Sequence, residues 1–224
     1  METNVEFENV QAKKPSLFGM ISSPGLQFER MKAKSPIGLP IFFMIVLMAI
    51  GGALASYISL NNPIIKDINS TAGMKIPVSL TVGMGAFGAG IGGAISFFII
   101  AAFYKLCMIF MGNDTPYKKL LGITVYSSII SSIGLIVNGI IALLLGGYEA
   151  TYTSLAPLVG DNKTLKAIAG RFDIFDIWYY VVILIGMQIV AGLSKTKAIA
   201  LVVILFLIGI GFSSLSGLFP QFGG

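Results

Sequence analysis

Residues 37–58 read IGLPIFFMIVLMAIGGALASYI, a run without a single charged side chain. A helix rises about 1.5 Å per residue, so a run of this length can cross the ~30 Å hydrocarbon core of a membrane. Four further apolar runs follow at residues 84–110, 121–145, 177–193 and 198–218. The fourth run is the shortest, and residues 172–176 extend it outward. The sequence therefore predicts five transmembrane helices.

The composition of the whole chain agrees with this prediction. Hydrophobic residues make up 55% of the 224 residues and charged residues only 11%, against roughly 25% charged in a soluble domain. Because backbone polar groups must be satisfied inside the lipid, we expect an all-α polytopic membrane helix bundle. The chain has no histidine and one cysteine, which excludes a histidine-based triad and an intrachain disulfide.

We divide the chain into four regions by polarity. Residues 1–14 are expected to form a mobile cytoplasmic tail, residues 15–35 an amphipathic interfacial segment, residues 36–218 the five-helix transmembrane domain, and residues 219–224 a short C-terminal tail. In the interfacial segment, Ser23 and Pro24 are typical of the start of a helix. Its apolar side chains are Leu17, Phe18, Ile21, Leu26, Phe28 and Met31. A solvated linker with a few apolar residues is the alternative interpretation of this segment.

The basic residues predict the orientation in the membrane. Ten of the fifteen lie in the N-terminal region, near the connection after the second run, or in the turn at residues 194–197. The positive-inside rule then places the N-terminus in the cytoplasm and the C-terminus outside the cytoplasmic membrane, with five spans. The two outer loops are the longer ones, and a short helix capped by Asp161 or Asn162 is expected at residues 162–169.

Small residues repeat at four-residue intervals in the second run. Gly88 and Gly92 form one GxxxG pair, and a parallel stripe consists of Gly85, Ala89 and Gly93. In lipid, small residues let two helix backbones approach closely. We expect these residues to form helix-packing contacts, either with another span of this chain or with a partner protein. A nucleotide-binding role is disfavoured because no strand precedes the glycines.

Polar residues in the third and fourth runs are further candidates for contacts. Ser128, Ser131 and Ser132 share a helix face, and Asn138 and Gln188 lie deep in apolar surroundings. The serines either bond to carbonyls one turn back or line a polar pathway. We favour packing, because no carboxylate accompanies them within the membrane. Each amide needs a partner, since an unpaired amide in hydrocarbon is costly.

The start of the fourth run carries two carboxylates, Asp173 and Asp176. Both are expected to cap the helix or to interact with its dipole, while Trp178 lies at the depth of an aromatic belt. A contact with a partner through Asp176 and a cation site are the alternatives. No catalytic residue, metal ligand set or cofactor site is predicted.

Two stretches resemble the Yip (Ypt/Rab-interacting protein) domain family, in its bacterial branch. The first runs from residues 17–24, LFGMISSP, to residues 27–30, QFER. The second combines FDIFDIW at residues 172–178 with a glycine and an SKTKA hairpin turn. Its motif residues are Phe172, Asp173, Phe175, Asp176, Trp178, Gly186, Ser194, Lys195 and Lys197.

This resemblance implies a non-enzymatic membrane protein. Eukaryotic members bind small GTPases, and bacterial members are associated with transport machinery, one type accompanying ABC exporters that resist antimicrobial peptides. The leading hypothesis is therefore an accessory or scaffold protein that aids such a complex through helix–helix contacts. Its expected partners are membrane lipids and either ABC exporter components or a second copy, with no nucleic acid. The alternative is a small transporter or channel that uses the polar face of the third span.

Overall fold

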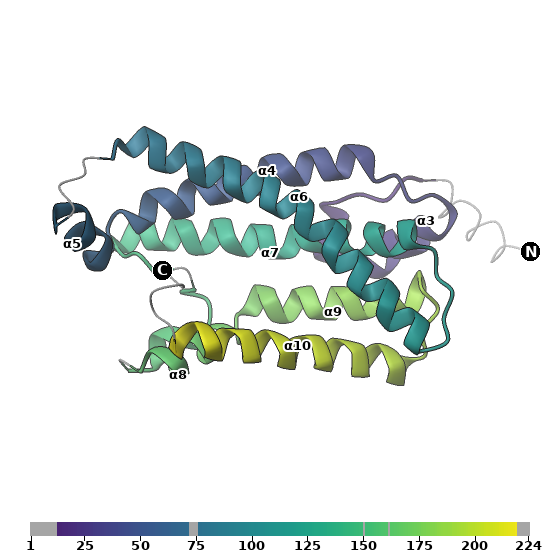
Figure 1. Cartoon of the computed structure of the whole chain (residues 1–224). Coiled ribbons are helices and arrows are strands. Elements are labelled where there is room, and N and C mark those ends of the chain that lie inside the picture. The colour runs from purple at the N-terminus through teal and green to yellow at the C-terminus, as the bar shows by residue number, and fades with distance from the viewer. Residues whose placement is uncertain (1–12, 72–75, 150, 161, 219–224) are drawn as a thin grey trace, which may run out of the picture. The chain divides into compact units, whose positions relative to one another are not determined.

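The computed structural model describes residues 13–71, 76–149, 151–160 and 162–218, and every regular element in these ranges is a helix (Figure 1). The helices are α2 (Gly19–Ser22), α3 (Pro24–Ala33), α4 (Gly38–Ser59), α5 (Pro63–Thr71), α6 (Val78–Phe110), α7 (Tyr117–Leu145), the 3-10 helix η1 (Ala156–Leu158), α8 (Lys163–Gly170), α9 (Ile174–Ile189) and α10 (Lys195–Leu218). The expected C-terminal tail and most of the expected N-terminal tail lie outside the described residues.

The membrane helix bundle is confirmed, with four or five spans among the described residues. Helices α4, α6, α7 and α10 are each long and apolar enough to cross a membrane. Helix α9 has only 16 residues, fewer than the ~20 that a crossing needs. With α8, from which it is bent by 45°, it can form a fifth, broken span. The fourth span is thus not one continuous helix: it is interrupted before Ile174, and α9 ends at Ile189 rather than at residue 193.

Residue packing divides the chain into two compact units. Unit 1 is formed by Met1–Met44, Ile95–Ser131 and Ile177–Ile208, and unit 2 by Ile45–Ala94, Ser132–Asp176 and Gly209–Gly224. Each helix long enough to cross a membrane contributes one part to each unit.

In unit 1, the N-terminal helices pack against the spans. Met20, Phe28 and Met31 have no exposed surface. A Cβ atom built on Gly186 of α9 would lie 2.7 Å from Cζ of Phe28, so the ring fills the space that the glycine leaves. The prediction that Phe28 and Met31 are presented to the membrane surface is therefore wrong for these two side chains, because the protein itself buries them.

The start of this N-terminal segment is held by side-chain contacts. Pro24 begins α3 and follows Ser23 as predicted, although the Ser23 side chain makes no capping bond. Instead, the Ser16 backbone N–H donates to Oε1 of Gln27 over 2.9 Å. Phe18 remains 61% exposed and its ring meets that of Phe43 edge-on, so part of the segment still offers apolar surface.

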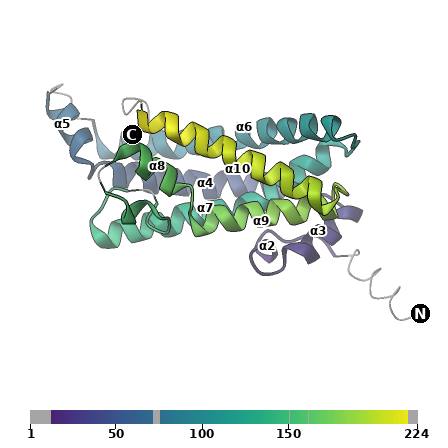
Figure 2. The same cartoon turned by 90° about the horizontal axis from the view of Figure 1, so that it is seen from below.

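Two turns of unit 1 bond to each other. Nδ2 of Asn113 and Oγ1 of Thr115, between α6 and α7, both donate to the Ala191 carbonyl, over 2.8 and 3.1 Å. Nζ of Lys197 donates to the Met111 carbonyl over 2.8 Å. These contacts bring together two connections that the charge pattern places on the same side of the membrane. The tight turn closes α9 and α10 into an antiparallel hairpin, and the two helices run side by side (Figures 1 and 2).

The connections in unit 2 contain short helices. Helix α5 was not expected from the sequence, whereas α8 begins at Lys163, one residue after the predicted start, and is capped by Asn162. Oδ1 of Asn162 accepts from the Leu165 backbone N–H over 2.9 Å, which is the capping bond that an asparagine provides at a helix start. Helix α8 packs against η1, and Lys166 pairs with Glu149.

Candidate functional site: two faces of helix α6 and a buried polar cluster

The first face of α6 packs against α4 in unit 2, where the two helices cross (Figure 1). A Cβ atom on Gly52 would lie 2.3 Å from Cβ of Ala89 and 2.5 Å from the Gly85 carbonyl oxygen. A Cβ atom on Gly85 would lie 1.8 Å from Oγ of Ser56. The two backbones approach so closely that no larger side chain fits, which is the packing that small residues permit in lipid.

Further positions of α4 and its neighbours extend this packing. A Cβ atom on Gly93 would lie 2.3 Å from Sδ of Met48. On α7, Gly139 lies against Leu54, with 2.4 Å between its built Cβ and Cδ2 of the leucine. The stripe formed by Gly85, Ala89 and Gly93 thus lies at contacts within the chain.

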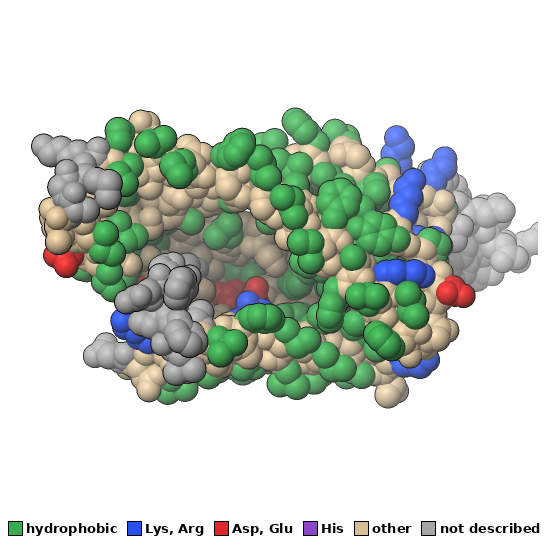
Figure 3. Space-filling model, in the orientation of Figure 1, with side chains coloured by type: hydrophobic (Ala, Val, Ile, Leu, Met, Phe, Trp, Pro, Cys, Tyr) green, Lys and Arg blue, Asp and Glu red, His purple; other side chains and the backbone are tan. Residues whose placement is uncertain are grey.

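The second face of α6 is open. At Gly88 and Gly92, a built Cβ atom meets no heavy atom of another described element within 4 Å. Met84 and Phe87 beside them are 66% and 70% exposed, and hydrophobic side chains gather over the helix in the space-filling view (Figure 3). We call the surface of Gly88 and Gly92 the open glycine face. Its small residues are flanked by exposed apolar side chains, so another helix could pack along it.

The serine side chains of α7 bond to their own helix or are at least partly buried in the protein. Oγ of Ser128 donates to the Thr124 carbonyl one turn back, over 2.8 Å. Ser132 is 4% exposed, and Ser131 is half-buried. Oγ of Ser127 is buried without a hydrogen-bond partner among the described residues.

A buried polar cluster in unit 2 combines Asn138, Thr153 and Asp173. Nδ2 of Asn138 donates to Oγ1 of Thr153 over 2.8 Å and lies 3.4 Å from Oδ2 of Asp173. Oγ1 of Thr153 donates to the same carboxylate oxygen over 2.5 Å, and Oδ1 of Asn138 accepts from the Thr153 backbone N–H over 2.8 Å. Asn138 and Asp173 are 4% and 5% exposed. The bonds to Thr153 thus give the buried amide of Asn138 partners outside its own helix.

This cluster provides hydrogen-bond partners for the backbone at the break between α8 and α9. Oδ1 of Asp173 accepts from the Phe175 backbone N–H over 2.8 Å, and the Ile174 N–H reaches the Thr153 carbonyl over 3.4 Å. Non-helical backbone at membrane depth is tolerated only where such partners exist. The sequence indicated a capping role for Asp173, but it did not reveal Thr153, which carries no motif and lies 15 residues from Asn138 and 20 from Asp173.

Asp176 pairs within the chain. Nη1 of Arg171 lies 3.3 Å from its Oδ2, and a Cβ atom on Gly209 of α10 would lie 2.8 Å from Nη2 of the arginine. Charged side chains of both signs are visible amid hydrophobic surface in Figure 3. Within the described residues, no group of three or more Asp, Glu, Cys or His side chains could hold a metal ion.

The remaining candidates lie in unit 1. Nε2 of Gln188 donates over 3.4 Å to the Leu184 carbonyl of its own helix. Lys195 is exposed at the start of α10, and Ser194 caps that helix with a long 3.4 Å bond from the Lys197 N–H. The two deep amides therefore differ, because only Asn138 joins separate elements.

The family follows from comparison with known proteins. A Yip1 domain model matches residues 18–216. The chain belongs to the Yip1 domain family. It is also 36% identical, over the full length of both chains, to a Bacillus subtilis (strain 168) protein named membrane protein YknW. No solved structure matches. The resemblance drawn from the FDIFDIW and SKTKA stretches is thus confirmed for the whole Yip1 domain.

Proposed function

We propose that this Yip1 domain protein is a non-enzymatic accessory or scaffold protein of a membrane transport complex, which it joins through the open glycine face. One observation supports this most. The small residues that face α4 are already in contact with it. At Gly88 and Gly92, which have the same four-residue spacing, a built Cβ atom meets no other described element within 4 Å. Helices associate in lipid through such small-residue surfaces, so the face is suited to a transmembrane helix of a partner.

The proposed partner is a component of an ABC exporter of the kind that confers resistance to antimicrobial peptides. This part of the proposal rests on the family resemblance. The absence of histidine from the sequence supports a role that depends on contacts rather than on catalysis. A second copy of the chain is the competing occupant of the open glycine face.

The test is co-purification from native membranes after crosslinking, with the captured proteins identified. Gly88→Leu and Gly92→Leu fill the face and should each abolish recovery of the partner while the protein still inserts. Gly211→Leu is the matched control, because Gly211 of α10 is another exposed glycine with nothing within 4 Å. Unchanged recovery in the Gly88 and Gly92 variants would reject this docking surface, and capture of the chain alone would indicate self-association.

A small transporter or channel is the second candidate. The burial of the Asp173 carboxylate beside Asn138, at a break in a span, is the observation in its favour. The purified protein in liposomes should then conduct a flux that Asn138→Ala and alanine at Ser128, Ser131 and Ser132 reduce. Flux that these changes leave intact would reject the pathway.

A further inference from the structure

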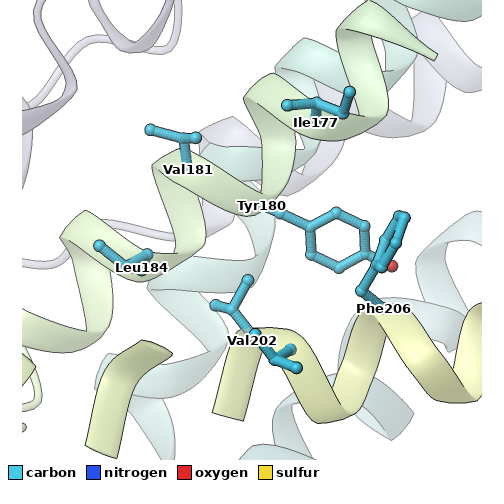
Figure 4. A pocket seen from close by; sticks show the side chains of 7 residues that line it. Ile177, Tyr180, Val181, Leu184, Val202 and Phe206 are labelled. Carbon is cyan, nitrogen blue, oxygen red and sulfur yellow. The ribbon is translucent and has the colours of Figure 1, made fainter. Parts of the chain in front are cut away.

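An apolar groove runs between α9 and α10 inside unit 1. The groove is lined from α9 by Ile177, Tyr180, Val181 and Leu184, and from α10 by Val202, Val203 and Phe206. All of these except Val203 are labelled in Figure 4. The Tyr180 and Phe206 rings meet edge-on at 5.6 Å and lie together in the close-up, away from Leu184. The groove is thus open along the hairpin and bounded by two aromatic rings.

The face of α10 that lines the groove also carries a positive charge, two turns before Val202. Residues 195, 199, 202 and 206 are spaced by four, three and four, so they share one face of α10. Lys195 on this face is exposed and makes no hydrogen bond or ion pair with the described chain. Phe206 follows it by eleven positions, a rise of about 16.5 Å. This length matches half of the ~30 Å hydrocarbon core, the depth of one leaflet.

Helix α9 contributes an amide, Gln188, between the charged end of the hairpin and the apolar groove. Gln188 follows Leu184 by four residues, so both occupy one face of the helix, and Gln188 is nearer to the α9–α10 turn. Its Nε2 is bonded only weakly, over 3.4 Å, to the Leu184 carbonyl. It is therefore available to a second acceptor between the charged end and the apolar groove.

We propose that this surface binds one anionic phospholipid, with its phosphate at Lys195, an ester carbonyl near Gln188 and an acyl chain in the groove. Along the hairpin, the charge of Lys195 is followed by the amide of Gln188 and then by the apolar groove. This order matches the phosphate, the ester and the acyl chain of a phospholipid. A zwitterionic lipid would fill the groove equally well but would gain less from Lys195, so the lysine confers selectivity for negative headgroups.

The single tryptophan of the chain provides the readout, because Trp178 follows Ile177 at the aromatic end of the groove. Ten residues of α9, a rise of about 15 Å, lead from Trp178 to Gln188, so the proposal places Trp178 near the acyl-chain ends and not at the interfacial depth expected from the sequence. The full-length protein is reconstituted in phosphatidylcholine brominated near the ends of its acyl chains, which quenches Trp178. Unbrominated phosphatidylglycerol should relieve the quenching at about fivefold lower concentration than unbrominated phosphatidylcholine does. Lys195→Ala should reduce this preference to about one, although the lysine is far from the tryptophan.

Lys118→Ala is the matched control, because it removes the same charge from an exposed position of unit 1 and should retain the preference. Val203→Phe, which fills the groove, should abolish it with Lys195 intact. Ile204→Phe changes an equally exposed neighbour and should not. Equal affinity for both lipids in the unmodified protein, equal loss in the Lys118 and Lys195 variants, or a preference that survives in a folded Val203→Phe protein would each overturn the proposal.

Discussion

The two faces of α6 are built from the same kind of residue at the same spacing, yet their surroundings differ. Gly85 and Gly93 lie so close to α4 that a methyl group would collide with it, while a Cβ atom built on Gly88 or Gly92 meets no other described element within 4 Å. A small-residue repeat therefore identifies a surface suited to close helix packing, but not which partner uses it. The effect of adding one methyl group at each glycine separates the two faces.

The largest effect is expected at the crossing of α4 and α6. Gly52→Ala and Gly85→Ala should each lower the free energy of unfolding by about 2–3 kcal/mol, because the new methyl group meets backbone atoms that cannot rotate away. Thermal unfolding of the purified variants in detergent measures this loss. An unchanged midpoint would mean that the helices do not approach as closely as described.

A second substitution tests which contact is responsible at Gly85. Its built Cβ atom lies 1.8 Å from Oγ of Ser56 and 2.8 Å from the Gly52 carbonyl oxygen. Combining Gly85→Ala with Ser56→Gly should therefore recover part of the lost stability but not all of it, because the carbonyl remains. Full recovery would assign the whole effect to the serine.

The next largest loss of stability is expected at one of the two deep amides, Asn138 and Gln188. Comparing them tests polar contacts in the same way as the glycines test packing. Asn138→Leu should cost about 2 kcal/mol, because it leaves the Thr153 N–H without its acceptor in a buried site. Gln188→Leu should change stability by less than about 0.5 kcal/mol, since its bond lies within one helix. Chemical unfolding of both variants checks this, and equal losses would contradict the difference.

The sequence predicted some of these features and could not predict others. Long apolar runs determine the membrane helices, because the thickness of the bilayer fixes their length. The break before Ile174 was not predicted, since it depends on Thr153 and Asn138, which are remote in sequence and carry no periodic signal. For Phe28, apolar character was evident, but whether lipid or Gly186 covers the ring is decided by tertiary packing.

A smaller effect is expected at Gly93, on the closed face. The atoms that its built Cβ would meet belong to the end of the Met48 side chain, which is flexible and can adopt another rotamer. Gly93→Ala should therefore cost about 1 kcal/mol or less in the same unfolding measurement. A loss as large as that of Gly52→Ala would show that Met48 has no other position.

The smallest effect, and one of opposite sign, is expected on the open glycine face. Gly88→Ala and Gly92→Ala should raise the free energy of unfolding by about 0.5 kcal/mol, because alanine loses less backbone entropy in a helix than glycine and meets no neighbour at these positions. Unfolding in detergent measures the isolated chain, and a loss of stability there would mean that another part of the chain covers this face. In native membranes, alanine remains small enough for close helix packing. These two variants should therefore retain the partner that Gly88→Leu and Gly92→Leu lose, which separates docking on this face from any effect on the fold.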